Sequence, residues 1–135
     1  LVNKAKKGEF AKANVEVKGI TKEDRLKYGI SIPYNETDDD ICYWRKCWNI
    51  RSVILKILHL GEEGGFYKFD PEDIPSIIKG LYNLIVNKDE WNDNDCIWEY
   101  KDMVPTILRN ILDLDRLIFY LKDHPDAEIS FYDSY

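Results

Sequence analysis

Apolar side chains recur at helical spacing in two stretches in the second half of the chain. The first stretch follows an Asp70–Pro71 pair, which is typical of a helix start because proline is tolerated at the first helical position. Its apolar residues are Ile74, Ile77, Ile78, Leu81, Leu84 and Ile85. Those of the second stretch are Ile107, Leu108, Ile111, Leu114, Leu117, Ile118 and Leu121. We therefore predict amphipathic helices over about 71–87 and 103–123.

A third long helix is predicted over about 40–60 from the spacing of its polar residues. These residues are four, three, four and three positions apart and would form one stripe: Arg45, Asn49, Ser52, Lys56 and His59. The acids at 38–40 would cap the start of this helix, and Gly61 would end it. Tyr43 and Cys47 would then face the core.

Short strands are predicted near the two ends of the chain. Val15 and Val17 alternate with polar residues, and so do Ile129 and Phe131. A short helix at 21–29 has Thr21 as its cap and a glycine as its stop. Because the termini of compact domains often lie close together, we expect the terminal strands to pair against the helices. The sequence thus predicts one α+β, mainly helical domain over 1–135.

Charge is distributed unevenly along the chain, whose 135 residues have a net charge of −6. Residues 1–30 contain eight Lys and Arg against four Asp and Glu, a net of +4, so the other 105 residues are at −10. We predict that this basic N-terminal segment is partly mobile. The acidic body disfavours nucleic acid as a partner, since DNA-binding surfaces need a cationic field, and it suits a basic protein surface.

The three cysteines, Cys42, Cys47 and Cys96, show neither a disulfide framework nor a zinc pattern. On a helix, Cys42 and Cys47 would point about 140° apart and could not share a metal ion or pair with each other. Reduced and mostly buried thiols are expected. No apolar run has the length of a membrane span and no targeting signal is visible, so we expect a cytoplasmic protein without a membrane partner.

Motifs of catalysis are absent from the sequence. There is no phosphate-binding loop, and the acidic run at 89–95 lacks the spacing of a calcium loop. The two histidines, His59 and His124, have no evident partner in the sequence. We therefore predict a protein that is not an enzyme and needs no cofactor or metal.

The stretch "ICYWRKCWNIR" at 41–51 holds the candidate binding residues. They combine aromatic and cationic side chains, both enriched at binding hot spots: Tyr43, Trp44, Arg45, Lys46, Trp48 and Arg51. Two interpretations remain open. The indoles cover the core while Arg45 pairs with the preceding acids, or the same residues form a recognition surface for a protein or, less favoured, for an anion or nucleic acid.

Residues 43–46, Tyr-Trp-Arg-Lys, and the aromatic tail "EISFYDSY" resemble a group of small uncharacterised proteins from bacterial and phage genomes. In that group the helix reads Tyr-Trp-Arg-Lys-Ala-Asn-x-Ile-His, and the tail ends in an aromatic strand. The match covers 40–60 and 97–135, with Trp48 in place of Asn and Arg51 in place of His. The resemblance implies a phage or prophage accessory protein and no particular activity.

Together these patterns predict an accessory protein that binds a host or self protein partner, as an inhibitor or as a homo-oligomer. The alternative is a small-molecule or nucleotide-binding protein, or a cryptic enzyme, with a pocket near the start of the 43–51 stretch. A structure separates the two interpretations, because they place Trp44 and Arg45 differently.

Overall fold

The computed structural model describes residues 12–33, 39–61 and 63–134. The strands are β1 (Lys12–Val17), β2 (Asp40–Arg45), β3 (Gly65–Lys68) and β4 (Ile129–Asp133), and the helices are α2 (Lys22–Tyr28), α3 (Trp48–Ile57), α4 (Ile74–Val86) and α5 (Tyr100–Asp123). Short 3-10 turns lie at Pro71–Asp73, Lys88–Glu90 and Asp93–Asp95.

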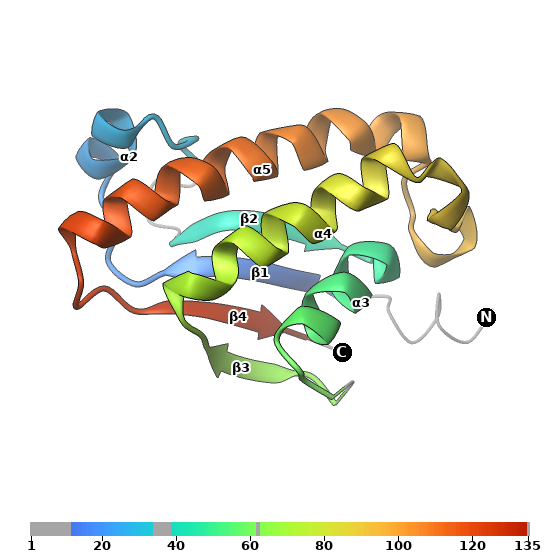
Figure 1. Ribbon diagram of the computed structural model, residues 1–135, viewed down its shortest axis with the longest axis horizontal. Coiled ribbons are helices and arrows are strands. Elements are labelled where there is room, and N and C mark those ends of the chain that lie inside the picture. Colours follow the sequence, from blue (N-terminus) through green and yellow to red (C-terminus); the bar gives the residue numbers. More distant parts are fainter. Residues whose placement is uncertain (1–11, 34–38, 62, 135) are drawn as a thin grey trace.

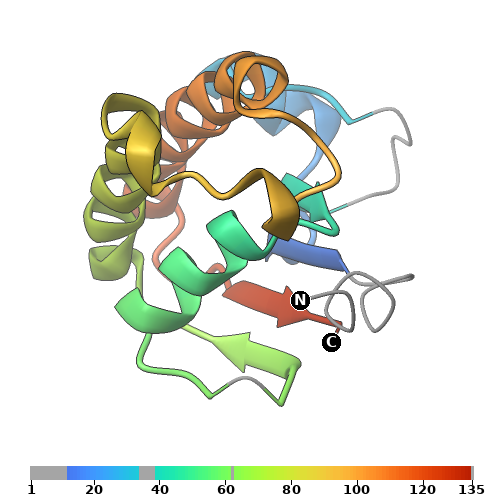
Figure 2. The ribbon, with the colours of Figure 1, turned by 90° about the vertical axis from the view of Figure 1, so that its right-hand side faces the viewer.

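The four strands form one antiparallel sheet in the order β2-β1-β4-β3. Helices α3, α4 and α5 cover one face of this sheet, so the fold has two layers (Figures 1 and 2). The predicted pairing of the terminal strands is confirmed, because β1 runs antiparallel to β4 with Val15 opposite Phe131. The α+β class is therefore confirmed.

Alternation along the strands builds the core between the two layers. Ala13, Val15 and Val17 of β1 are buried, and so are Ile129 and Phe131 of β4. Because side chains alternate between the faces of a strand, these residues share the face that meets the helices. The described elements contribute to one continuous hydrophobic cluster.

Helix α2 forms where the sequence predicts it. The Thr21 hydroxyl accepts from the Asp24 amide while the Asp24 carboxylate accepts from the Thr21 amide, which makes a capping box. Gly29 ends the helix in the left-handed conformation at φ 75°. Residues 12–30 of the basic N-terminal segment thus contain β1 and α2. Residues 1–11, for which mobility was also expected, lie outside the described residues.

The helices predicted at 71–87 and 103–123 are present with shifted ends. A 3-10 turn at Pro71–Asp73 precedes α4, and α5 begins at Tyr100. Helix α4 also packs closely on α3, because a methyl group at Gly80 would lie 2.6 Å from Val53 Cγ1. No helix in the described part of the chain is both long and apolar enough to cross a lipid bilayer.

The prediction of a helix over 40–60 is wrong in its first part. Residues 40–45 are β2, Lys46 turns the chain at φ 51°, and α3 begins only at Trp48. Asp39 and Asp40 therefore cap no helix, and Asp38 lies outside the described residues. Residues 41–44 have β-branched, thiol and aromatic side chains that fit a strand, and burial alternates at 42–45. Pairing with β1 then favours the strand over a helix.

A buried ion pair connects α3 to the end of the sheet. The Arg51 Nε donates to Asp133 Oδ1 over 2.7 Å, and both side chains have 0% exposure. The Arg51 guanidinium also lies 4.4 Å from the centre of the Trp48 ring, in cation–π contact. Trp48 and Arg51 therefore contribute to the packing of α3 against β4.

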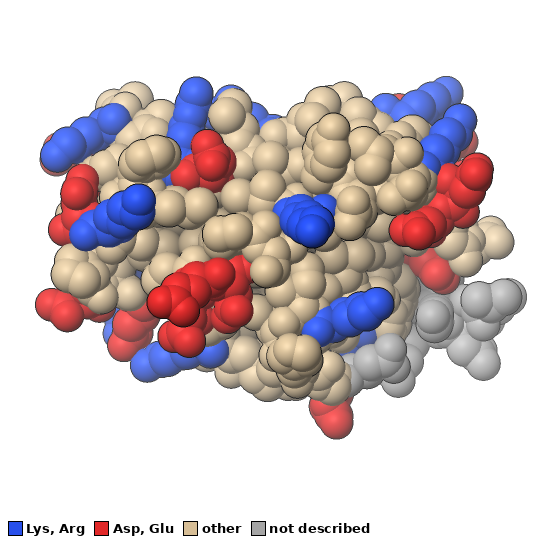
Figure 3. Space-filling view, in the orientation of Figure 1, with Lys and Arg blue, Asp and Glu red and all other residues tan. Residues whose placement is uncertain are grey.

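The helical face of the molecule carries charges of both signs. Figure 3 shows lysine and arginine side chains at separate places on this face, and acidic side chains in groups near the beginning of α4 and at the right-hand end of the view. This mixture provides no broad cationic surface for nucleic acid on the face that the view shows.

Candidate functional site

The sequence-predicted site residues divide between the surface and the core. Tyr43 and Arg45 are exposed, whereas Trp44 is buried at 3% exposure, because the three residues alternate along β2. Tyr43 was expected to face the core, and its 48% exposure corrects that expectation. Trp48 and Arg51 lie inside, so the structure does not bring them to the same surface as Tyr43.

Trp44 fixes the position of this part of β2. Its indole Nε1 donates to Asn110 Oδ1 of α5 over 2.8 Å, and both residues are buried. A buried indole needs such a partner, since an unpaired N–H in the interior destabilises the fold. The bond holds the strand and α5 together beneath the exposed side chains of Tyr43 and Arg45.

A groove of about 560 Å³ opens between β2, the segment that precedes α5, and the first turns of α5. It is lined by Tyr43, Trp44 and Arg45 from β2, by Ile97 and Trp98, and by Asp102, Met103 and Thr106. Its volume lies within the range of ligand pockets, roughly 300–1,000 Å³. Of the six candidates from the sequence, three line the groove.

The groove has an apolar floor and an aromatic rim. Trp44 and Met103 are buried beneath it, while Ile97 and Trp98 are about half exposed, at 53% and 52%. Arg45 and Asp102 are also exposed and place one charge of each sign among the lining residues. In the described part of the chain Arg45 makes no ion pair, so the expected pairing with Asp39 or Asp40 does not occur.

The two chain segments that line the groove are connected at its end. Asn49 Nδ2 donates to the Asn92 carbonyl over 2.9 Å, and the Asn92 amide donates to Asn49 Oδ1 over 3.2 Å. Beyond this pair, the Ile97 amide donates to the Lys46 carbonyl over 3.3 Å, and Cys47 and Cys96 form an isolated antiparallel bridge. The segments are therefore held by backbone and side-chain contacts.

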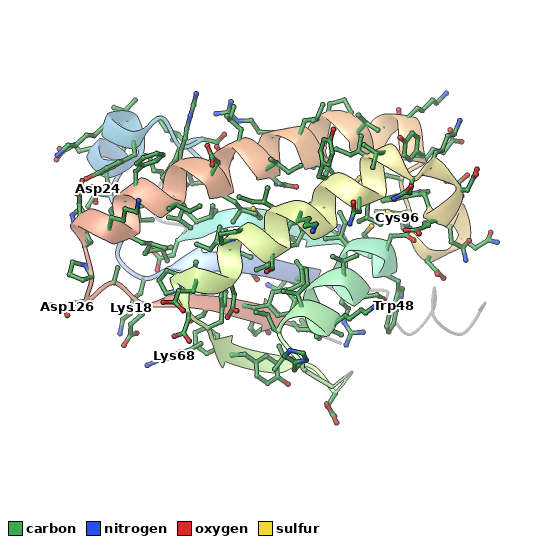
Figure 4. The ribbon with its side chains drawn as sticks, in the orientation of Figure 1. Lys18, Asp24, Trp48, Lys68, Cys96 and Asp126 are labelled. Carbon is green, nitrogen blue, oxygen red and sulfur yellow. The ribbon has the colours of Figure 1, made fainter. Side chains whose placement is uncertain are left out.

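The thiols of this bridge differ in their surroundings. Cys47 is buried and Cys96 is partly exposed. Figure 4 labels Cys96 in the segment between α4 and α5. The hydrogen bond from the Cys47 thiol lowers the pKa of Cys96, and the Trp98 amide acts in the same direction. The same hydrogen bond, together with burial, raises the pKa of Cys47.

The groove has no arrangement typical of a catalytic centre. Asp102 is the one acid among the described lining residues, and no histidine or cysteine lines the groove. His124 lies at the end of α5, stacked on Tyr120, with its Nδ1 2.9 Å from the Tyr120 carbonyl. The structure also places no group of three or more metal-ligating side chains together among the residues it describes.

The sequence did not predict five of the eight residues that line this groove. Ile97 and Trp98 form an apolar pair within the polar stretch 87–102, and that exception was the available signal. Their position against Tyr43 depends on the bridge between Cys47 and Cys96, which has no signature in the sequence. The distance of about 50 residues along the chain hides the contact.

Comparison with known proteins found no matching family model, no matching curated protein and no matching solved structure.

Proposed function

We propose that the chain is a non-enzymatic binding protein whose groove receives an apolar or aromatic side chain from an extended segment of a partner protein. The observation that carries the proposal is the exposure of Tyr43, Ile97 and Trp98 around one groove, at 48%, 53% and 52%. Large exposed apolar side chains that cluster are typical of interaction sites, and Trp, Tyr and Arg dominate binding hot spots.

The position of the groove supports an extended partner segment. β2 is an outer strand of the sheet, and its far edge pairs with no strand in the described part of the chain. A segment that lies along this strand would form backbone hydrogen bonds with it and place a side chain in the groove. The net charge of −6 favours a partner with a basic surface around that side chain.

The resemblance of residues 43–46 and of the tail to bacterial and phage proteins supports a host protein as the partner. It is the only support for a phage or prophage origin, which stays a prediction, as do inhibition of the partner and a cytoplasmic location.

Affinity capture from host lysate with matched variants tests the proposal. Tyr43→Ala, Trp98→Ala and Arg45→Glu are compared with Tyr82→Ala and Lys79→Glu, which change exposed residues on α4. Tyr82 is a close control for Tyr43, since the two are 53% and 48% exposed. A partner identified in this way is then purified and its affinity measured by calorimetry.

We expect Trp98→Ala to weaken the purified complex by about 30-fold, which corresponds to the loss of a hot spot of about 2 kcal/mol. The two α4 variants should bind like the wild type. Equal affinity of all five variants, with each variant folded by circular dichroism, would exclude the groove as the binding site.

A small-molecule site is the second candidate function. The volume of about 560 Å³ and the cation Arg45 beside two aromatic rings suit an anionic aromatic ligand such as a nucleotide. Trp98 supplies an intrinsic probe, because its fluorescence should be quenched as a nucleotide stacks on it. Titration with nucleoside phosphates, with Trp98→Phe as the control, distinguishes this function: unchanged emission excludes nucleotides.

A further inference from the structure

The bridge between Cys47 and Cys96 has the backbone geometry of a disulfide site. Both residues are extended, with φ −125° and ψ 95° at Cys47 and φ −147° and ψ 143° at Cys96. The hydrogen bond from the Ile97 amide to the Lys46 carbonyl joins the residue after one cysteine to the residue before the other. This pattern identifies an antiparallel pair of the type that exchanges no hydrogen bonds between its own members.

Side chains of such a pair lie on the same side of the ladder and approach closely. The Cα atoms of a pair of this type are about 4.5 Å apart, and disulfides span Cα distances of roughly 4.4–6.8 Å. The two thiols can therefore be joined without moving either segment. The hydrogen bonds between Asn49 and Asn92 hold the same two segments on the other side of the bridge.

We propose that Cys47 and Cys96 form a reversible dithiol–disulfide site, in which hydrogen peroxide oxidises Cys96 first and Cys47 then resolves it.

Exposure decides which thiol reacts first. Cys47 retains 3% of its surface and Cys96 is partly exposed, so peroxide in solution reaches Cys96. The thiolate is the reactive form of cysteine, and the lowered pKa of Cys96 increases its share. Asp93 acts against this effect, since its charge raises the same pKa. The buried Cys47 is suited to the second step, because it faces the product of the first.

The chemistry balances with peroxide as the oxidant. The Cys96 thiolate attacks one peroxide oxygen, the O–O bond breaks, and a sulfenic acid and hydroxide form. The Cys47 sulfur then attacks the sulfenic sulfur, so that the S–S bond forms and the S–O bond breaks. The oxygen leaves as water with the proton from Cys47. Two thiols are thereby oxidised by two electrons, and one peroxide is reduced to two waters.

The third cysteine provides an internal control. Cys42 is buried at 2% exposure on β2, with the Asp113 and Asp40 carboxylates near its thiol. Burial raises its pKa, so it stays a thiol. In the unfolded chain, however, Cys42 is only five residues from Cys47, and closing that short loop is favoured over closing the long one to Cys96.

Peptide mapping after mild peroxide treatment tests the proposal on the whole chain. The folded protein is oxidised, free thiols are blocked under denaturing conditions, and disulfide-linked peptides are identified by mass spectrometry. Dimedone present in parallel samples traps sulfenic acid. The variants are Cys42→Ser, Cys47→Ser and Cys96→Ser, each checked for folding, and the wild type is also oxidised in urea.

The expected product is a Cys47–Cys96 disulfide in the wild type and in Cys42→Ser, which a dithiol reductant reverses. Cys47→Ser should instead accumulate dimedone-labelled Cys96 severalfold above the wild type. In urea, links to Cys42 should appear. Trapped Cys96 at equal levels in the wild type and Cys47→Ser would overturn the proposal, and so would a folded product linked through Cys42 or between two chains.

Discussion

At the scale of single residues, the Arg51–Asp133 pair is a buried contact whose loss should strongly destabilise the fold. Both partners are fully buried, and the guanidinium is packed against Trp48. Removal of Asp133 takes a hydrogen-bonded carboxylate away from a buried guanidinium, and such changes cost about 3–5 kcal/mol. We expect Asp133→Ala to lower the free energy of unfolding by that amount, measured by urea denaturation.

The exposed pair Lys68–Glu128 is the matched control. Its side chains are 66% and 46% exposed, and solvent screens their interaction. Glu128→Ala should therefore leave the urea midpoint unchanged. The double variant Arg51→Met with Asp133→Leu should regain most of the stability lost in Asp133→Ala, since both charges of the pair are replaced by apolar side chains. A midpoint equal to wild type for Asp133→Ala alone would contradict the buried ion pair.

Cys96 should show its environment in its reactivity with alkylating agents. A lowered pKa means that more thiolate is present at any pH below the ordinary cysteine value, so alkylation is faster at neutral pH. We expect iodoacetamide to label Cys96 well before Cys42 and Cys47, with a rate-against-pH midpoint below that of a free cysteine. Mass spectrometry of the labelled peptides measures each site separately.

Substitution at Cys47 tests whether its hydrogen bond causes the lowered pKa of Cys96. Cys47→Ala removes the hydrogen-bond donor, so the pKa of Cys96 should rise and its alkylation at neutral pH should slow. Cys47→Ser keeps a hydroxyl donor and should retain more of the effect. The same midpoint in Cys47→Ala as in the wild type would show that the hydrogen bond is not the cause.

At the scale of elements, α4 approaches α3 closely at Gly80. A methyl group at Gly80 would be 2.6 Å from Val53 Cγ1 and 2.8 Å from Ile57 Cδ1, so these side chains or the helices that carry them would have to shift. Overpacking of this kind costs about 1–3 kcal/mol, and the better helix propensity of alanine returns up to about 1 kcal/mol. Gly80→Ala should therefore destabilise the protein by about 1 kcal/mol in urea denaturation.

Ser76→Ala, an exposed change on the same helix, provides the comparison and should have little effect. Val53→Ala removes the obstructing methyl group, so its cost should be smaller in the Gly80→Ala background than in the wild type. Independent, additive effects of the two substitutions would refute the close contact.

The helices and strands differ in how far the sequence pattern could predict them. The 3.6-residue period at 74–85 predicts α4 because its isoleucine and leucine side chains are all buried or partly buried. The polar stripe from Asn49 onward is real, since Ser52, Lys56 and His59 are exposed. Arg45 belongs to the stripe by spacing alone. The six-residue strand β2 contains too few positions to separate its period from that of a helix, and only pairing with β1 decides it.

At the scale of the whole molecule, the groove depends on contacts distant in sequence. Tyr43 and Arg45 could be named from the sequence as binding candidates, but Trp98 enters the site through the bridge between Cys47 and Cys96. Such a bridge forms hydrogen bonds with only a few backbone groups of two irregular segments, so it leaves no periodic pattern in the sequence. Its consequence is global, because the cysteines close a loop of about 50 residues that contains α3, β3 and α4.

Oxidation of that pair should therefore stabilise the molecule as a whole. A disulfide across a loop of about 50 residues removes chain entropy from the unfolded state, worth up to about 4 kcal/mol when the native geometry is unstrained. We expect the urea midpoint of the peroxide-treated protein to rise and to return to its original value after reduction. Peroxide-treated Cys96→Ser should keep the midpoint of its untreated form. The linked segments also carry Tyr43 and Trp98. An unchanged midpoint in a fully oxidised wild type would therefore mean that strain in the groove cancels the stabilisation gained by constraining the unfolded chain.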